Sequence, residues 1–342
     1  MLPFTNLSDD KDNTAFFSDG MHEDILTTLA NIPDLRVISR TSVMEYRGTT
    51  KKISQIAREL GVAYILKGNV RRAGNQIRLT GQLIRAAKDE HLWAKSYDRE
   101  LTPKEIFAIQ AALATEIAGA LQAAISPAAK KLVERRPTEN RAAYDLYLQA
   151  RNLPQTGRAL PDRVQLLQEA VKLDPNFAEA WGDLADVHAT FITYGTDTTP
   201  ERLALADAAI ARAVRLAPDV PEIIYAFGRY AQAGYRDYPR AAEQFEKVIR
   251  LQPKNSEAGL NLARVQRSQG LWLEAVANFH RAAALDSGNL AALRGLLLAG
   301  RRWDEALAVK RRINARHEGD GTGAVGIGAN RLCRNRLDQG VR

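Results

Sequence analysis

The fragment Ala170-Val-Lys-Leu-Asp-Pro175 decides the fold, because its pattern returns three more times along the chain. The later copies are Ala213-Val-Arg-Leu-Ala-Pro218, Val248-Ile-Arg-Leu-Gln-Pro253 and Ala282-Ala-Ala-Leu-Asp-Ser287. Their last residues lie 43, 35 and 34 positions apart. A helix end that recurs about every 34 residues indicates a repeated pair of antiparallel helices. One such pair cannot bury its apolar face alone, so neighbouring pairs are expected to stack into a curved solenoid.

The consensus of each helix pair is matched where it is most specific. Trp181-Gly-Asp-Leu184-Ala185-Asp-Val-His188 follows the opening of a first helix, with histidine in place of the usual tyrosine. Ala241-Ala-Glu-Gln-Phe245 and Ala275-Val-Ala-Asn-Phe279 follow the pattern of a second helix. Small residues are needed where two helices cross closely, and bulky residues fill the space between units. The chain therefore resembles tetratricopeptide-repeat proteins, and an irregular helical bundle is the weaker alternative.

About five repeat units are expected within residues 140–316, at 142–175, 178–218, 221–253, 256–287 and 290–316. The insertion Tyr194-Gly-Thr-Asp-Thr-Thr-Pro200 explains the step of 43 residues and is interpreted as a lengthened turn in the second unit. Thr199 is expected to cap the helix that follows it, and Pro200 to occupy its first turn. The last unit is short, as terminal repeats often are.

Residues 1–126 have a different rhythm, which predicts an α+β domain with a mixed sheet and flanking helices. Helices are expected at 15–30, 53–60 and 106–125, the second one ended by Gly61. Phe16, Phe17 and Asp19-Gly20 are placed at the entry to the first helix. Strands are expected at 35–40, 63–70, 77–84 and 91–97, with a hairpin turn at Ala73-Gly74-Asn75. The whole chain is thus an α+β domain followed by an all-α tetratricopeptide-repeat solenoid.

The same half carries a family resemblance. Leu2-Pro-Phe-Thr-Asn-Leu-Ser8, Phe17-Ser-Asp-Gly20, Lys67-Gly-Asn-Val-Arg-Arg72 and Leu92-Trp-Ala-Lys-Ser-Tyr-Asp-Arg99 resemble the TolB amino-terminal-like (FlgO-like) domain. In bacterial signalling proteins that domain often precedes tetratricopeptide repeats and follows an adenylate cyclase, a protein kinase or a winged-helix domain. The resemblance implies a bacterial protein and brings no catalytic motif. A ligand role for Arg71, Arg72 and Arg99 is the weaker reading beside a structural one.

The two ends and the linker carry further expectations. The family's first strand begins several residues before Leu2-Pro-Phe4, so a start placed too late, or a degenerate relative, is expected. The shortened strand, Leu2 to Leu7, should pair over only a few residues, and the α+β half should melt separately as the less stable part. Residues 127–139 are interpreted as a solvated basic linker, and residues 317–342 as a disordered tail rich in glycine and arginine.

Composition argues against several classes of function. The net charge of +8 is spread along the chain, whereas a nucleic-acid domain concentrates its charge on one face, so no nucleic-acid partner is expected. The five histidines are scattered and Cys333 is the only cysteine, so no metal and no cofactor are expected. The sequence shows no apolar span and no leader, which predicts a cytoplasmic protein. It also shows no phosphate-binding loop and no metal-ligand spacing, which predicts a protein that is not an enzyme.

Two functional hypotheses remain open. The first is a scaffold module whose repeat groove binds a protein or peptide. The second is the regulatory C-terminal part of an adenylate cyclase or protein kinase whose catalytic domain lies outside this chain. Arginines in the groove could pair with a partner's carboxylate, because a guanidinium offers a planar fork of donors; solvated arginines are an equally good reading. Exposed side chains of the first helices are expected to line the groove: Asp183, Asp186, Tyr225, Arg229, Gln232, Asn261, Arg264 and Arg267.

Overall fold

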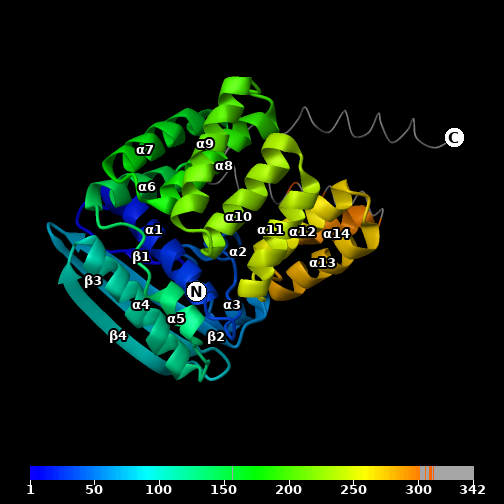
Figure 1. Cartoon of the computed structure of the whole chain (residues 1–342). Helices are drawn as coiled ribbons and strands as arrows, with labels where there is room; N and C mark the ends of the chain where they lie inside the picture. Colours follow the sequence, from blue (N-terminus) through cyan, green and yellow to red (C-terminus); the bar gives the residue numbers. More distant parts are fainter. Residues whose placement is uncertain (156, 301–304, 306–307, 310, 312–342) are drawn as a thin grey trace.

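The computed structural model describes residues 1–155, 157–300, 305, 308–309 and 311. The chain begins with a domain built on one sheet, here called the sheet domain (residues 1–126), and continues as an array of helix pairs, here called the repeat array (residues 141–300) (Figure 1). The elements of the sheet domain are β1 (Thr5–Asn6), α1 (Lys11–Ala30), α2 (Arg40–Val43), the 3-10 helix η1 (Met44–Tyr46), α3 (Ile53–Leu60), β2 (Tyr64–Ala73), β3 (Gln76–Arg85), β4 (Glu90–Glu100) and α4 (Pro103–Ala120).

The sheet has the strand order β1-β2-β3-β4, with β1 parallel to β2 and the other pairs antiparallel. The first strand is short, as expected: Thr5 and Asn6 pair with Asn69 and Val70. Two further backbone bonds extend it, from Leu2 N to Leu66 O and from Leu7 N to Val70 O, both at 2.8 Å. The predicted strands of the meander are confirmed, and so is the left-handed Gly61 that ends α3.

Two local expectations for the sheet domain are wrong. Residues 35–39 form no strand and lie outside the sheet. The backbone N–H of Ser39 donates instead to Asp286 Oδ2 of the repeat array at 3.1 Å. Gly20 lies in the middle of α1, not at its entry. A side chain there would place its Cβ 2.6 Å from Cδ2 of Leu148, so the glycine allows the first repeat helix to approach α1 closely.

The repeat array consists of antiparallel helix pairs, and three of the first helices begin at an asparagine cap. Asn140, Asn255 and Asn289 each accept a hydrogen bond from the backbone N–H three residues on, which satisfies an otherwise free donor. The helices are α6 (Arg141–Asn152), the 3-10 helix η2 (Gly157–Ala159), α7 (Leu160–Leu173), α8 (Ala178–Tyr194), α9 (Pro200–Leu216), α10 (Pro221–Tyr230), the π-helix η3 (Ala231–Tyr235), α11 (Tyr238–Leu251), α12 (Ser256–Ser268), α13 (Trp272–Leu285) and α14 (Leu290–Ala299).

The insertion in the second unit lies in the turn between α8 and α9, where Thr199 caps α9 by accepting from Arg202 N at 3.2 Å, as predicted. The turn is not the whole explanation for the step of 43 residues. Helices α8 and α9 have 17 residues each, against 13 and 14 in α12 and α13. The second half of the expected fifth unit and the tail lie outside the described residues, apart from positions 305, 308–309 and 311.

The segment between the two parts is not a bare solvated linker. It forms α5 (Pro127–Val133), which Ser126 caps by accepting from Ala129 N at 3.2 Å. Ala129 and Val133 are buried, and Arg135 makes an ion pair with Glu179 of α8. Only part of the basic cluster is solvated, because its apolar residues and Arg135 pack against the rest of the molecule.

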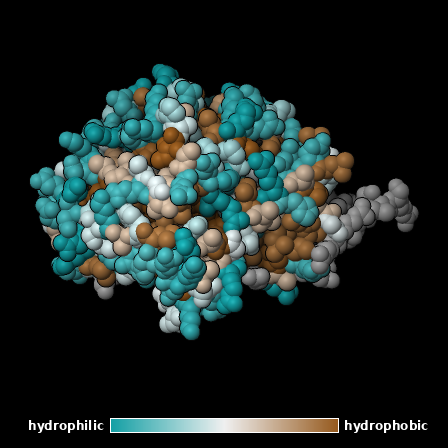
Figure 2. Space-filling view, turned by 90° about the horizontal axis from the view of Figure 1, so that it is seen from below, coloured by the Kyte–Doolittle hydropathy of each residue, from teal (hydrophilic) through white to brown (hydrophobic). Residues whose placement is uncertain are grey.

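The repeat array curves over the α1 side of the sheet domain, so that α6 lies by α1 and the later units reach the region of α2 and α3 (Figure 1). One apolar core runs without interruption from Phe4 through the sheet and α1 to Tyr230 of the third unit. A shared core couples the two parts, which argues against the expected separate melting of the sheet domain. Seen from below, the surface is largely hydrophilic, with apolar side chains gathered toward the end where α13 and α14 lie (Figure 2).

Helix crossing in the fourth unit gives a first testable prediction. Ala275 is 1% exposed and packs with Phe279 and Leu260. We expect Ala275→Leu to lower the free energy of unfolding by about 1–3 kcal/mol, because the extra volume forces α12 and α13 apart. Ala277 of the same helix is exposed, so Ala277→Leu is the matched control. Urea unfolding measures both; equal stabilities of the two variants would contradict this packing.

Candidate functional site

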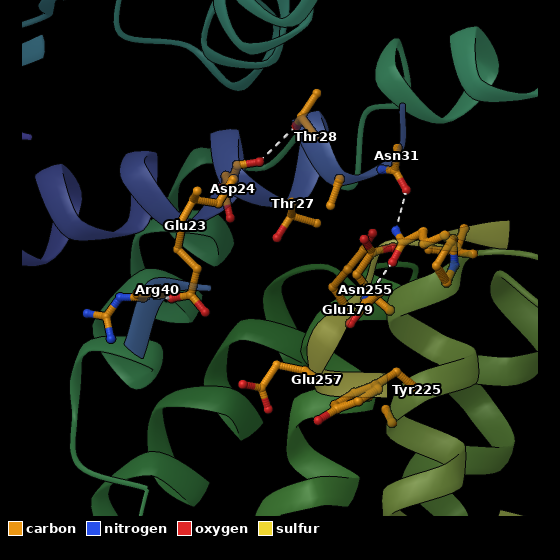
Figure 3. A pocket seen from close by; sticks show the side chains of 18 of the residues that line it. Glu23, Asp24, Thr27, Thr28, Asn31, Arg40, Glu179, Tyr225, Asn255 and Glu257 are labelled. Atoms are coloured by element: carbon orange, nitrogen blue, oxygen red, sulfur yellow. Dashed lines mark hydrogen bonds and ion pairs between the residues drawn. The ribbon is translucent and has the colours of Figure 1, made fainter. Parts of the chain in front are cut away.

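A cavity of about 500 Å³ lies between the sheet domain and the concave side of the repeat array; it is here called the chamber. Its wall on the sheet-domain side comes from α1 and from residues 33–41. Its opposite wall comes from α6, α7, α8, α10 and the start of α12. In Figure 3, Glu23, Asp24 and Thr27 point from α1 toward this space, and Tyr225 and Glu257 lie across it on the repeat helices. The concave groove expected for a partner is thus partly covered by the chain's own sheet domain.

A half-buried ion cluster lines the chamber beside α6. Arg151 donates to Asp24 Oδ1 at 2.8 Å and pairs with Glu23 Oε1 at 2.5 Å, and its guanidinium lies over the ring of Tyr147. The Tyr144 hydroxyl donates to the other oxygen of Asp24. Burial opposes ionisation of Glu23, but Arg151 and Arg40 together hold its pKa below the usual value. This cluster joins α6 to α1, and it needs both partners because an unpaired charge there would be costly.

A second group of contacts joins the repeat array to the segment that follows α1, and it is made by residues of the repeated fragment. The fifth residue of the fragment is Asp174, Ala217, Gln252 and Asp286 in its four copies. Gln252 donates to Asn31 Oδ1 at 2.7 Å. Asp286, fully buried, accepts from the hydroxyls of Ser39 at 2.5 Å and Ser42 at 2.9 Å. The third and fourth units therefore hold the segment that follows α1.

Three glutamates repeat along the wall of the chamber. Glu179, Glu222 and Glu257 are the second residues of α8, α10 and α12. Glu179 pairs with Arg135, and Glu257 accepts from Asn289 Nδ2 at 3.2 Å. Within the described part of the chain, Glu222 makes no hydrogen bond or ion pair with another residue. Burial raises the pKa of Glu222 to about 7.

The pKa of Glu222 gives a second prediction. Its ordinary value is 4.5, so between about pH 4.5 and pH 7 the native carboxyl keeps a proton that the unfolded chain loses. Stability therefore falls as the pH rises through this window. We expect Glu222→Gln to raise the free energy of unfolding at about pH 8 by about 1–2 kcal/mol, allowing for solvent screening, and to change it little at about pH 4. Urea unfolding across this range checks it, with exposed Glu246→Gln as the control; a difference that does not vary with pH would contradict it.

The structure divides the eight residues predicted to line the groove. Asp183, Asp186, Tyr225 and Arg229 line the chamber. Arg229 already has a carboxylate partner within the chain. Its guanidinium makes two hydrogen bonds to Asp186 of the neighbouring unit, with nitrogen–oxygen distances of 2.9 and 3.4 Å. The aromatic ring of Tyr225 packs against the ring of Phe245, and its hydroxyl accepts from Asn261 Nδ2 at 2.7 Å.

The remaining four residues lie outside the lining of the chamber. Asn261 is buried, and Arg264 donates to its Oδ1 at 3.1 Å. Arg267 lies with its guanidinium 6.0 Å from the centre of the Phe279 ring. Gln232 is half-buried in the π-helix η3. The structure brings Asn261, Arg264 and Tyr225 together, and Gln232 and Arg267 are not among the residues that line the chamber.

Several chamber residues were missed by the sequence analysis. Glu222 and Glu257 could have been found, because glutamate recurs at the second position of successive first helices. Glu23, Asp24 and Arg151 could not, since only the docking of the two parts brings them together. The ligand set suggested for Arg71, Arg72 and Arg99 is not assembled: they pair separately with Asp9, Asp145 and Glu105.

Comparison with known proteins finds a family match for most of the sheet domain. Residues 1–116 match the family model of the second domain of HilA/YgeH-like transcriptional regulators. A curated relative, "Putative adenylate cyclase 3" of Rhizobium meliloti (strain 1021), is 37% identical over 206 residues, which is 59% of this chain and 35% of the relative. The chain therefore spans about a third of the length of that relative.

Solved structures are more distant. The crystal structure of MamA covers 48% of this chain and 91% of its own, with 19% identity and a TM-score of 0.33. A second MamA structure covers 54% and 97%, with 18% identity and a TM-score of 0.34. Within the described residues, no helix is both long and apolar enough to cross a membrane, and no three histidine, cysteine or acidic side chains converge to hold a metal ion.

Proposed function

We propose that this chain is a non-catalytic interaction module of a bacterial signalling or regulatory protein that acts in the cytoplasm. In this proposal a TolB-like sheet domain is held by a tetratricopeptide-repeat array, and the array binds a protein or peptide partner. The observation that carries it is the closure of the repeat array's concave side on its own sheet domain through Arg151 and Asp286. A partner that engages the array would be sensed directly by the sheet domain, since the two share one core.

The partner surface proposed here is the part of the groove outside the chamber, where Gln232, Arg264 and Arg267 lie. Two arginines on successive turns of α12 suit an acidic segment of a partner, because guanidinium groups form strong hydrogen bonds with carboxylates. Arg264 is held by Asn261, so its position is fixed before a partner arrives. A fixed donor loses less conformational freedom on binding than a mobile one.

Charge reversal tests this proposal. The tagged full chain is used to capture proteins from its own cells, and so is the double variant Arg264→Glu/Arg267→Glu. We expect a partner recovered with the parent chain to be lost from this variant. The matched control is Arg215→Glu/Arg250→Glu, whose arginines are exposed on second helices. Recovery of the same proteins with all three chains would reject this surface.

A second candidate function is supported by the cyclase relative. The similarity over 206 residues suggests that the module regulates an adenylate cyclase. Purified chain added to a cyclase of that kind whose matching segment has been removed should change its rate of cyclic AMP formation. An unchanged rate over a range of chain concentrations would remove this candidate.

The expected lack of nucleic-acid binding also stays a prediction, and it is checked by fluorescence anisotropy with duplex DNA at low salt.

A further inference from the structure

One arginine of the chamber, Arg163, makes no hydrogen bond or ion pair with any residue that the structure describes. Arg163 of α7 is 4% exposed and lines the chamber, and its buried Nε finds no acceptor in the described part of the chain. A buried guanidinium without a hydrogen bond is costly, because the interior cannot replace the water that the charge has lost. The other four arginines that line the chamber each pair with a carboxylate: Arg40, Arg135, Arg151 and Arg229. Arg163 is therefore a place where an anionic group fits.

Two carboxylates face the same chamber without direct partners. Neither Asp183 of α8 nor Glu222 of α10 makes a hydrogen bond or ion pair with another described residue. Burial raises the pKa of Asp183 to about 6, although Arg151 and Arg163 lie near enough to oppose the shift. Asp183 is one helical turn from Asp186, whose oxygens are already taken by Arg229. Among the described residues, the chamber thus offers one cation and two carboxyl groups that have no direct partner.

We propose that the chamber binds a small zwitterion of the α-amino acid class, whose carboxylate contacts Arg163 and whose ammonium group contacts Asp183 and Glu222. A simple anion would leave the two carboxylates without a cation, and a simple amine would leave Arg163 alone. A free amino acid supplies both charges within one small molecule. The cavity of about 500 Å³ is large enough for any amino-acid side chain, and Tyr147 and Tyr225 add aromatic surface to its wall. This goes beyond the proposed partner binding, and its test needs no protein partner.

The test is isothermal titration calorimetry of the full chain with each of the twenty free L-α-amino acids. The best binder is then compared with its N-acetyl and methyl-ester derivatives, which lack one charge each. Sulfate and putrescine serve as probes that carry a single sign of charge. We expect saturable binding of at least one amino acid with one site per chain, and about tenfold or weaker binding for each derivative.

Variants locate the site. Arg163→Met and Glu222→Gln should each weaken binding by about tenfold or more, while Arg215→Met and Glu246→Gln, both exposed, should not. Thermal melts show whether Arg163→Met folds. If it does not fold, the binding of the amino acid to Glu222→Gln and the binding of the blocked derivatives to the parent chain test the proposal. Binding of sulfate alone or of putrescine alone would overturn the zwitterion proposal, and so would the absence of heat with every probe or binding that survives both Glu222→Gln and the blocked derivatives.

Discussion

Replacing Arg151 with methionine is expected to lower the free energy of unfolding by about 3–5 kcal/mol. The methionine keeps the aliphatic stem that packs on Tyr147, but it removes the cation that Glu23 and Asp24 share at 2.5 and 2.8 Å. Asp24 would then lose its cation, and Glu23 would keep only its longer pairing with Arg40 at 3.7 Å. Urea unfolding at neutral pH, followed by circular dichroism, measures the loss.

A matched control separates the effect of losing the Arg151 charge from the effect of replacing any arginine with methionine. Arg215 is exposed on α9, so Arg215→Met should change the free energy of unfolding by less than about 0.5 kcal/mol. The triple variant Arg151→Met/Glu23→Gln/Asp24→Asn should regain part of the loss, because the unpaired charges disappear together. A single variant as stable as the parent chain would show that the cluster does not hold the two parts together.

The second large effect is expected at Asp286. Asp286→Ala should lower the free energy of unfolding by about 2–4 kcal/mol, because the hydroxyls of Ser39 and Ser42 and the N–H of Ser39 lose their buried acceptor. Asp219 lies at an exposed position between units two and three, so Asp219→Ala is the control. Scanning fluorimetry ranks the melting temperatures of the two variants, and urea unfolding gives their free energies of unfolding. Identical melting temperatures for the two variants would contradict the role of Asp286.

The fold was largely predictable because its signals are periodic. The recurrence that ends at Pro175, Pro218 and Pro253 gave the helix pairs, and the alternation in 64–100 gave the strands of the sheet. Helix caps such as Thr199 and Gly61 were also readable, since their chemistry is local. Residues 35–40 were wrongly predicted to form a strand, because a β-branched run becomes a strand only where it can pair with the edge of a sheet.

The candidate site was predictable only in part. Asp183, Asp186, Tyr225 and Arg229 follow from the geometry of a repeat, and they do line the chamber. The pairing of Arg229 with Asp186 depends on the distance between neighbouring units, which no single repeat encodes. The covering of the groove by α1 depends on Gly20 and Leu148, two residues that are 128 positions apart and show no shared pattern in the sequence.

The sheet domain and the repeat array form one body, joined through Arg151 to α1 and through Asp286 to the segment that follows α1. Differential scanning calorimetry of the full chain tests it most directly. We expect one cooperative transition for the parent chain and its separation into two for the double variant Arg151→Met/Asp286→Ala. Two transitions in the parent chain, unmoved by the double variant, would contradict it.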